Sequence, residues 1–285
     1  MNINRLESLT YGVEDLEGCK RYYDDWGLTA TAEGQHGIDY ILPSGQSVRL
    51  RSAGDRSLPK PVEGGSTIRE ITWGVEDATS LDAVGAALSR DRDLSDNGDV
   101  LRTLDPWQMG VAFCVARPGT TPVHAAMRGR NQTIEIRERI RPRRIGHVVL
   151  NIPPSKMEQT SEFYLDRLQF RLSDRVIQFG EFLRCSGSVD HHNLFLLQKP
   201  DGGLNHVAFE VENVDEVVMG GKFMQGRGWE AATTVGRHVM GSNLFWYFKN
   251  PAGALTEYFS DMDVIDDDWE PRIWDKNPGF SYWTT

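Results

Sequence analysis

Residues 236–258, GRHVMGSNLFWYFKNPAGALTEY, predict two strands joined by a tight turn. Residues 242–249 are rich in aromatic and apolar side chains, as expected of a largely buried strand. The turn falls at residues 250–253, NPAG, where Pro fixes φ and Gly supplies a positive φ. The second strand, residues 254–259, carries one carboxylate, Glu257. A charge inside an apolar strand is costly unless it is paired or binds a metal.

Two histidines upstream of this hairpin stand in similar settings. His147 and His206 lie near the start of strand-like runs at residues 144–150 and 204–209, and a helical pattern follows each run, at residues 156–168 and 214–227. Two His and one Glu on three separate strands can form a facial ligand set, which leaves metal positions open and suits Fe(II) oxygen chemistry. Such a set leaves Fe(II) with a net positive charge, which favours an anionic bidentate ligand such as a catecholate.

The composition of the 285 residues is that of a globular protein, with 39% hydrophobic and 10% aromatic residues. A net charge of −10 argues against a nucleic-acid partner, which requires a basic surface. The N-terminus shows no basic region followed by an apolar run, and no apolar run has the length of a membrane span, so we expect neither a secretory signal nor a membrane segment. Three scattered cysteines without metal-type spacing favour reduced thiols and a cytoplasmic protein.

The chain also resembles itself. Residues 9–15 are similar to residues 145–151, and residues 71–77 are similar to residues 204–211. The repeat predicts four β-α-β-β-β units, two in each half of an α+β protein. We expect two domains, residues 1–135 and residues 136–285, with the boundary in the basic, Pro-containing connection near residues 129–142.

Superposing the halves places the three candidate ligands opposite other residue types: His147 opposite Tyr11, His206 opposite Trp73, and Glu257 opposite His124 or Val123. Keeping the spacing between His206 and Glu257 gives His124 as the counterpart of Glu257. Aligning residues 111–119 with residues 245–253 gives Val123 instead. Tyr and Trp are poor Fe(II) ligands, and a lone His124 favours a packed or hydrogen-bonded histidine. We therefore expect residues 1–135 to lack a metal and residues 136–285 to hold it.

A family resemblance rests on five features at fixed spacing: Gly236-Arg-His238, Tyr247, Asn250-Pro251, Gly253 and Glu257. They resemble the signature of the type I extradiol ring-cleavage dioxygenases of the vicinal oxygen chelate superfamily, the family of 2,3-dihydroxybiphenyl 1,2-dioxygenase. The resemblance covers both domains in arrangement and is specific in the second half. The chain departs from the signature at Trp246, where the family has an aliphatic residue or Phe, and at Met240-Gly241, where some relatives place polar residues that touch substrate.

The resemblance implies a vicinal oxygen chelate (glyoxalase-like) fold and an enzyme of aromatic-compound catabolism. Its reaction is Fe(II)-dependent extradiol, or meta, cleavage of a catecholic ring, with O2 as co-substrate and both oxygen atoms incorporated. Mn(II) is the alternative metal, and homo-oligomers are common in such families. The resemblance assigns His147, His206 and Glu257 as metal ligands, His192 as the residue that handles a proton, and His238 and Tyr247 as hydrogen-bond partners of the substrate hydroxyls.

Side-chain chemistry agrees with these roles. A His with an ordinary pKa near 6.5 can accept a catechol proton and return it, and a Tyr hydroxyl can donate to a phenolate oxygen. Strand alternation places Phe245 and Tyr247 on one face and Trp246 on the other. By the same alternation we expect His191 to point away from His192, and we expect Tyr258 to point away from Glu257 into the core.

Two other classes of function share this fold. One is a non-redox metal lyase or isomerase, such as a glyoxalase or an epimerase, and the other is a small-molecule binding protein without a metal. A single His-His-Glu set in one half favours oxygen activation over the first class, and His192, His238 and Tyr247 argue against the second. We expect Val149, Phe182 and Phe195 to line the substrate pocket, and residues 271–283 either to fold over its mouth or to contact a neighbouring subunit.

Overall fold

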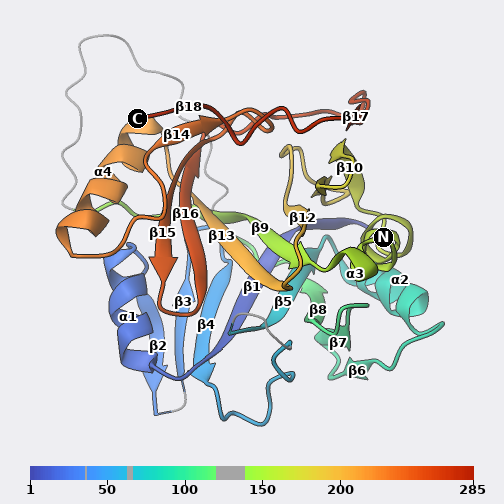
Figure 1. The fold of residues 1–285 in the computed structure, drawn as a ribbon. Coiled ribbons are helices and arrows are strands. Elements are labelled where there is room, and N and C mark those ends of the chain that lie inside the picture. Colours follow the sequence, from blue (N-terminus) through green and yellow to red (C-terminus); the bar gives the residue numbers. More distant parts are fainter. Residues whose placement is uncertain (36, 63–66, 120–138) are drawn as a thin grey trace.

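The computed structural model describes residues 1–35, 37–62, 67–119 and 139–285. Four β-α-β-β-β units follow one another along these parts of the chain, two in each half, and a C-terminal tail adds two short strands (Figure 1). The α+β class and the four-unit architecture predicted from the internal repeat are confirmed. The boundary predicted between residues 135 and 136 and the residue His124 lie outside the described residues, so the division at that point stays a prediction.

The first half forms one sheet and two helices. Its strands are β1 (Ile3–Val13), β2 (Ala30–Gly34), β3 (Gly37–Ile41), β4 (Ser47–Ser52), β5 (Ile68–Val75), β6 (Ser95–Asp96), β7 (Val100–Leu104) and β8 (Gly110–Val115). Its helices are α1 (Leu16–Asp25) and α2 (Ala78–Leu88).

The second half forms a larger sheet. Its strands are β9 (Arg144–Ile152), β10 (Arg171–Val176), β11 (Gly180–Arg184), β12 (Leu194–Gln198), β13 (Gly203–Glu210), β14 (Gly236–His238), β15 (Leu244–Asn250), β16 (Ala254–Ser260), β17 (Arg272–Trp274) and β18 (Ser281–Thr284). Its helices are α3 (Pro154–Glu162), which continues into a π-helical turn at Phe163–Arg167, and α4 (Val214–Gly226).

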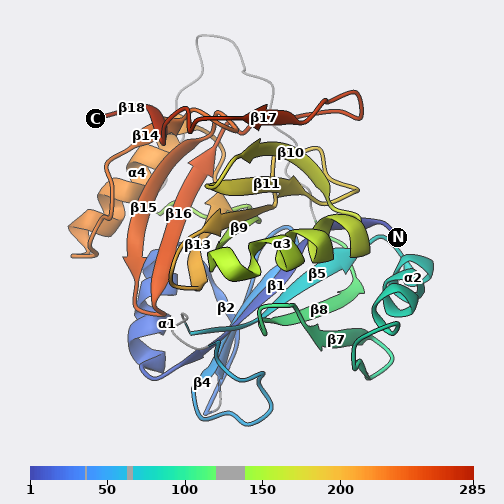
Figure 2. The same cartoon turned by 45° about the vertical axis from the view of Figure 1, so that its right-hand side comes forward.

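The strand order of the two sheets is the same when the numbering is shifted by eight. The first sheet runs β2-β3-β4-β1-β5-β8-β7-β6, and the second runs β10-β11-β12-β9-β13-β16-β15-β14, with β17 and β18 added at its edges. In each unit the first and last strands pair in parallel, and the two units of a sheet meet through antiparallel first strands. The two halves pack on each other, the second above the first in Figure 2.

Short polar side chains begin three of the four helices. Asp15 accepts a hydrogen bond from the amide of Gly18, Asp77 accepts one from Ser80, and Asn213 accepts one from Glu216. Each of these bonds satisfies one amide that has no partner within its helix. Helix α3 begins instead at Pro154, whose fixed φ suits the first helical turn.

The structure corrects part of the superposition of the two halves. Residues 111–119 begin in β8, the last strand of its unit, whereas residues 245–253 begin in β15, the third strand, so matching them is wrong. Asp77 lies five residues after Thr72, as Asn213 lies five after Ala208. Thr72 pairs across the first sheet with Ser8 and Ala112, and Ala208 pairs across the second with His147 and Glu257.

Matching by register therefore places His147 opposite Ser8 rather than Tyr11, and His206 opposite Glu70 rather than Trp73. It places Glu257 opposite Ala112 rather than opposite His124 or Val123. Tyr11 and Trp73 are buried in aromatic contacts instead, Tyr11 with Tyr23 and Trp73 with Phe170. Tyr11 and Trp73 do lie on the corresponding strands, β1 and β5, so for the two histidines the sequence match was wrong only in register. Only the match of β8 to β15 joined the wrong strands, because aromatic strands resemble one another whatever their place in a unit.

The hairpin predicted at residues 242–259 has the expected form. Strands β15 and β16 pair in antiparallel fashion, and Gly253 in the turn between them has a φ of 89°. Trp246 lies on the core side of β15 against α4, where a Cβ on Gly221 would come within 2.0 Å of its ring. The absence of a side chain at that glycine is what allows a tryptophan where the family has a smaller residue.

Gln46 joins the two halves beneath the strand that carries His147. Its buried side-chain amide donates to the carbonyl oxygens of Leu6 and Ile145, at 2.8 and 2.7 Å, and accepts from the amide of Ile145 at 2.8 Å. Ile145 lies two residues before His147 on β9. The first half therefore fixes the start of this strand by satisfying its backbone groups.

The C-terminal tail crosses the second sheet. Strand β17 pairs with β10 at one edge and β18 pairs with β14 at the other, so residues 275–280 lie between two anchored ends (Figure 1). Of the two positions expected for this segment, the structure shows the fold-back over the second half of the same chain. No helix among the described residues is both long and apolar enough to cross a membrane.

Candidate metal centre

Three neighbouring strands of the second sheet carry the three predicted ligands. His147 lies on β9, His206 on the central β13 and Glu257 on β16. Ala208 of β13 is the register partner of both His147 and Glu257, and His206 lies two residues before Ala208. Because side chains alternate along a strand, all of these residues face the same side of the sheet. The small side chain of Ala208 leaves the space between them open.

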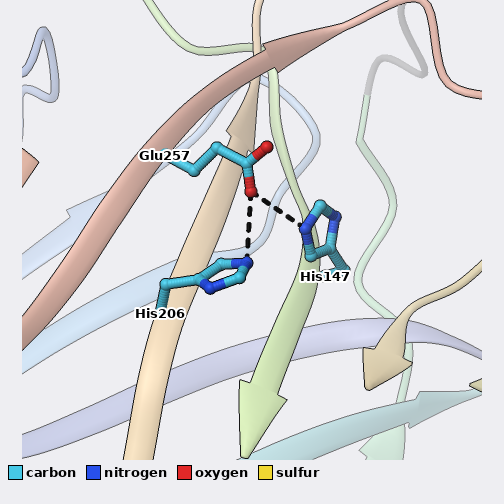
Figure 3. Close-up of side chains that lie close together, drawn as sticks. All are labelled: His147, His206 and Glu257. Atoms are coloured by element: carbon cyan, nitrogen blue, oxygen red, sulfur yellow. Dashed lines mark hydrogen bonds and ion pairs between the residues drawn. The ribbon is translucent and has the colours of Figure 1, made fainter. Parts of the chain in front are cut away.

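The three side chains converge on one point (Figure 3). Glu257 Oε2 lies 3.1 Å from His147 Nε2 and 3.2 Å from His206 Nε2, and one ligand atom from each residue lies within 4.8 Å of the others. All three residues are buried. Among the described residues, these three side chains are the set of His, Cys, Asp or Glu that lies close enough together to share one metal ion.

The hydrogen bonds of His206 leave its inner nitrogen ready to bind a cation. His206 Nδ1 donates to Asn205 Oδ1 at 2.9 Å, and Asn205 is held in turn by a bond from its amide to Asn151 Oδ1. A neutral His206 therefore carries its lone pair on Nε2, the nitrogen that faces Glu257. That atom is buried and makes no hydrogen bond with the described residues. This donor set fits a divalent metal.

Electrostatics keep Glu257 ionised. Burial raises the pKa of this carboxyl, but the neighbouring imidazoles, His147 foremost, outweigh burial and hold the pKa well below its usual range. Asn243 Nδ2 donates to Glu257 Oε1 at 3.0 Å. Burial lowers the pKa of His206, which favours its neutral form. Metal binding requires an ionised carboxylate and a neutral imidazole, and the pKa shifts of Glu257 and His206 favour these forms.

His238 and Tyr247 form a pair beside the three ligands. His238 Nδ1 donates to the carbonyl oxygen of Phe280 in the tail at 2.9 Å, so His238 Nε2 accepts the hydroxyl proton of Tyr247 at 2.9 Å. Tyr247 is the register partner of Glu257. Burial, and then the charge of Glu257, raise the pKa of Tyr247 well above its usual value, so its hydroxyl stays protonated.

His192 lies on the other side of His147. The two ring centroids are 4.3 Å apart, and Phe182 contacts the His192 ring at 5.2 Å. Burial, and then the nearby His147 and His191, lower the pKa of His192 well below its usual value. The structure thus brings all six residues assigned by the family resemblance into one region.

One expectation about this region is wrong. His191 does not point away from His192: its Nδ1 lies 3.1 Å from His192 Nδ1, and its ring is completely buried. Strand alternation does not apply to this pair, because β12 begins only at Leu194. Tyr258, in contrast, does point away from Glu257 into the core, as expected.

A pocket of about 210 Å³ is lined by five of the six residues, all except the buried Glu257. Its walls are mainly apolar, and they include the three residues expected there from sequence. The apolar lining consists of Val149, Phe179, Phe182, Phe195, Leu197, Ala232, Met240, Leu255 and Phe280. Asn277, Gly279 and Phe280 come from the tail, which therefore closes one side of the mouth. None of the described residues that line the pocket is Lys or Arg.

Comparison with known proteins agrees with the fold and the site. Residues 144–258 match the Glyoxalase/Bleomycin resistance protein/Dioxygenase superfamily. The second half of the chain therefore carries a domain of this superfamily, and the resemblance inferred from sequence is confirmed. Both histidines of the candidate centre, together with Glu257, lie within the matched residues.

Two curated relatives are similar over part of the chain. Metapyrocatechase 2 from Cupriavidus necator is 38% identical over 128 residues, which are 45% of this chain and 39% of that protein. An iron-dependent extradiol dioxygenase from Rhodococcus jostii (strain RHA1) is 32% identical over 142 residues, 45% of this chain and 47% of that protein. The matched part thus spans less than half the length of either relative.

A solved structure is similar over the whole chain. The Mn(II)-bound glyoxalase from Novosphingobium aromaticivorans superposes with a TM-score of 0.82 at 25% identity, covering 99% of this chain and 91% of that one. Both halves therefore share the vicinal oxygen chelate fold expected from the family resemblance.

Proposed function

We propose that this protein is an extradiol dioxygenase that opens a catecholic ring with O2, cleaving beside the two hydroxyls and placing both oxygen atoms in the product. The observation that carries the proposal is the convergence of His147, His206 and Glu257 at the end of an apolar pocket, with the His238–Tyr247 pair beside them. The names of the two curated relatives support the same activity.

The resident metal of this proposal is Fe(II), held by His147 Nε2, His206 Nε2 and Glu257. A bound Fe(II) would supply adjacent positions for the two catechol oxygens and for O2 and a route for electron density from the ring to oxygen. His206 is already in the tautomer that this role needs, because Asn205 accepts its Nδ1 proton. Mn(II) fits the same ligands, and metal content of the purified protein decides between the two.

His238 and Tyr247 orient the substrate in this proposal. Tyr247 keeps its proton, so its hydroxyl can donate to a substrate oxygen in place of His238. His238 is fixed by its bond to the carbonyl oxygen of Phe280, which leaves its Nε2 free to accept a proton from a substrate hydroxyl. On the opposite side, His192 accepts and returns a proton during ring opening.

The pocket walls indicate the kind of ring substituent that the enzyme accepts. Four phenylalanines, Phe179, Phe182, Phe195 and Phe280, line the pocket, and the described lining offers no cation to pair with a carboxylate on the substrate. Burying such a carboxylate without a partner would be costly. We therefore assign an uncharged catechol with an apolar substituent.

The similarity to a Mn(II)-bound glyoxalase favours a second candidate, a metal-dependent lyase or isomerase of the same fold. That chemistry needs no electron transfer to O2, and it would proceed with a redox-inactive metal such as Zn(II) in the site. The single carboxylate and the His238–Tyr247 pair are the features that favour ring cleavage instead.

One experiment separates the candidates. The protein is loaded with Fe(II) without oxygen, and catechols with apolar substituents are then added in air while O2 uptake and visible absorbance are recorded. We expect equal consumption of O2 and catechol and a yellow ring-fission product. A colourless mixture without O2 uptake across one-ring and two-ring catechols would refute the proposal, and turnover of a glyoxalase substrate with Zn(II) would support the lyase.

We also propose that the protein is cytoplasmic. All three cysteines are free thiols, which fits a reducing cytoplasm. The homo-oligomer expected from the family resemblance stays a prediction, which sedimentation of the purified protein tests.

A further inference from the structure

We propose that His191 and Asp174 are positioning residues that fix the tautomer of His192, through a buried chain of hydrogen bonds that ends on the C-terminal tail. The inference rests on the proposed function, because it gives His192 its role in proton transfer. It extends that function to two residues outside the pocket lining and to the tail segment that holds them.

The chain of contacts is short and buried. His192 Nδ1 lies 3.1 Å from His191 Nδ1, and His191 Nε2 lies 2.7 Å from Asp174 Oδ2. His191 and Asp174 have no exposed surface, and His192 is 4% exposed. Water therefore does not compete for these nitrogens and oxygens, so each hydrogen bond constrains the next one.

The direction of the hydrogen bonds follows from the carboxylate at the far end. An ionised Asp174 only accepts, so His191 Nε2 carries a proton and donates it. The Nδ1 of a neutral His191 then has a lone pair, which accepts the proton on His192 Nδ1. This leaves His192 Nε2 without a proton, as the nitrogen that is free to act on a substrate in the pocket that His192 lines.

Asp174 is held as an anion by the tail. Arg272 donates from Nε to Asp174 Oδ1 at 2.8 Å and from Nη2 to Asp174 Oδ2 at 2.7 Å, and Trp274 Nε1 donates to Asp174 Oδ1 at 2.8 Å. Such a bidentate Arg–carboxylate pair is strong and directional. Burial raises the pKa of Asp174, but these donors together with His191 outweigh it and keep the pKa below its usual value.

The tail also encloses His191 directly. The backbone amide of His191 donates to the carbonyl oxygen of Asp263 at 2.9 Å, and the ring of Trp269 packs edge-on against the imidazole at 6.1 Å. The guanidinium of Arg272 lies 4.6 Å from the centre of the Trp269 ring. Residues 263–274 thus fix His191 from several sides, so the tail and the orientation of His192 are coupled.

The first test reads the tautomer without metal or substrate. In metal-free protein labelled with 15N-histidine, long-range 1H–15N spectra distinguish a proton on Nδ1 from one on Nε2, and the His192 signals are those lost in His192→Phe. We expect the Nδ1–H form of His192 in the wild type and a mixture or the Nε2–H form in His191→Phe. An Nε2–H form in the wild type, or the same spectrum in both proteins, would overturn the inference.

The second test uses the iron-loaded enzyme. His191→Phe should lower kcat about 10- to 100-fold with KM and iron content unchanged, as for other residues that orient a catalytic group. His191→Asn should recover part of kcat, since its Oδ1 can accept from His192 Nδ1. Equal kcat for both variants, or a loss confined to KM, would contradict a positioning role.

Two further variants separate positioning from simple loss of structure. Arg171→Ala removes the ion pair of Arg171 with Asp267, so it loosens the same tail without touching Asp174, and it should leave kcat within about twofold of the wild type. Arg272→Lys keeps the charge but loses the bidentate pair, so it should lower kcat and disturb the His192 tautomer even if His191→Phe does not fold. Equal effects of Arg171→Ala and Arg272→Lys would overturn the inference. An inert enzyme with the expected tautomer would instead refute the proposed function alone.

Discussion

Trp26 of the first half stacks on Tyr258 of β16, with ring centroids 3.6 Å apart and ring planes at 2°. The Tyr258 hydroxyl donates to the carbonyl oxygen of Trp26 at 2.6 Å. Tyr258 directly follows Glu257, so the back of the strand that carries the candidate ligand rests on an aromatic residue from the other half of the chain. The first half thus supports the site without contributing any of the six assigned residues.

Replacing Trp26 by Ala should destabilise the protein, because it removes a completely buried ring and leaves a cavity between the halves. We expect the free energy of unfolding to fall by about 3–5 kcal/mol, measured by chemical denaturation. Tyr282→Ala is the matched control, since Tyr282 is 79% exposed and its loss should change stability by less than about 0.5 kcal/mol. Similar effects of both variants would show that the Trp26 stack does not support the second half.

Replacing His192 by Phe should leave metal binding intact and slow turnover. His192 is not one of the three candidate metal ligands, and Phe fills a similar volume between His147 and Phe182. We expect kcat to fall about 10²- to 10⁴-fold, the range for loss of a general acid or base, with iron content equal to that of the wild type. Unchanged turnover would refute the proton-transfer role.

Replacing Tyr247 by Phe should weaken catalysis without unfolding the protein. The change removes only the hydroxyl that donates to His238 Nε2, while the ring keeps its contact with His206 at 4.9 Å. Loss of one hydrogen bond to a charged substrate oxygen should lower kcat/KM about 10- to 100-fold. Steady-state kinetics measure the loss, and an unchanged melting temperature shows that it is local. Equal kcat/KM in both proteins would contradict the role of the Tyr247 hydroxyl in orienting the substrate.

The environment of Asp105 makes the stability of the protein depend on pH. Its Oδ1 accepts from the amides of Trp107 and Met109 in the turn between β7 and β8, while its buried Oδ2 makes no hydrogen bond with the described residues. Burial outweighs these two bonds and raises the pKa of Asp105 from 3.8 to about 7. Between these values the folded state binds more protons than the unfolded state, so the contribution of Asp105 to stability falls as pH rises and is lowest above about pH 7.

Asp105→Asn keeps an oxygen that accepts from both amides and removes the buried charge. The variant should therefore be more stable than the wild type by about 1–3 kcal/mol near pH 8, and the difference should shrink towards pH 5. Urea unfolding of both proteins at the two pH values measures this difference. A variant that is less stable than the wild type at the higher pH would contradict the assignment.

The sequence was sufficient for the features that depend on local pattern. The hairpin around Asn250–Gly253 could be predicted from turn chemistry, and the four units could be predicted from repeated strand and helix patterns. The convergence of His147, His206 and Glu257 followed from three strand positions together with the family signature.

Features that depend on register and on distant contacts could not be predicted. The counterparts of the ligands in the first half are set by strand pairing, and the similarity of aromatic strands pointed to the wrong ones. His191 was excluded by an alternation rule that fails just before β12. Its partner Asp174 lies 17 residues away in sequence, and Arg272, which binds Asp174, lies 81 residues away, so no local signal links them.

The metal content of the purified protein tests the central claim most directly. After anaerobic loading with Fe(II) and removal of free metal, we expect about one iron per chain in the wild type and in Glu70→Ala, which changes the first-half counterpart of His206. Glu257→Ala, checked for folding by its melting curve, should retain almost none. Full iron retention by folded Glu257→Ala would contradict the assignment of a His147–His206–Glu257 metal centre.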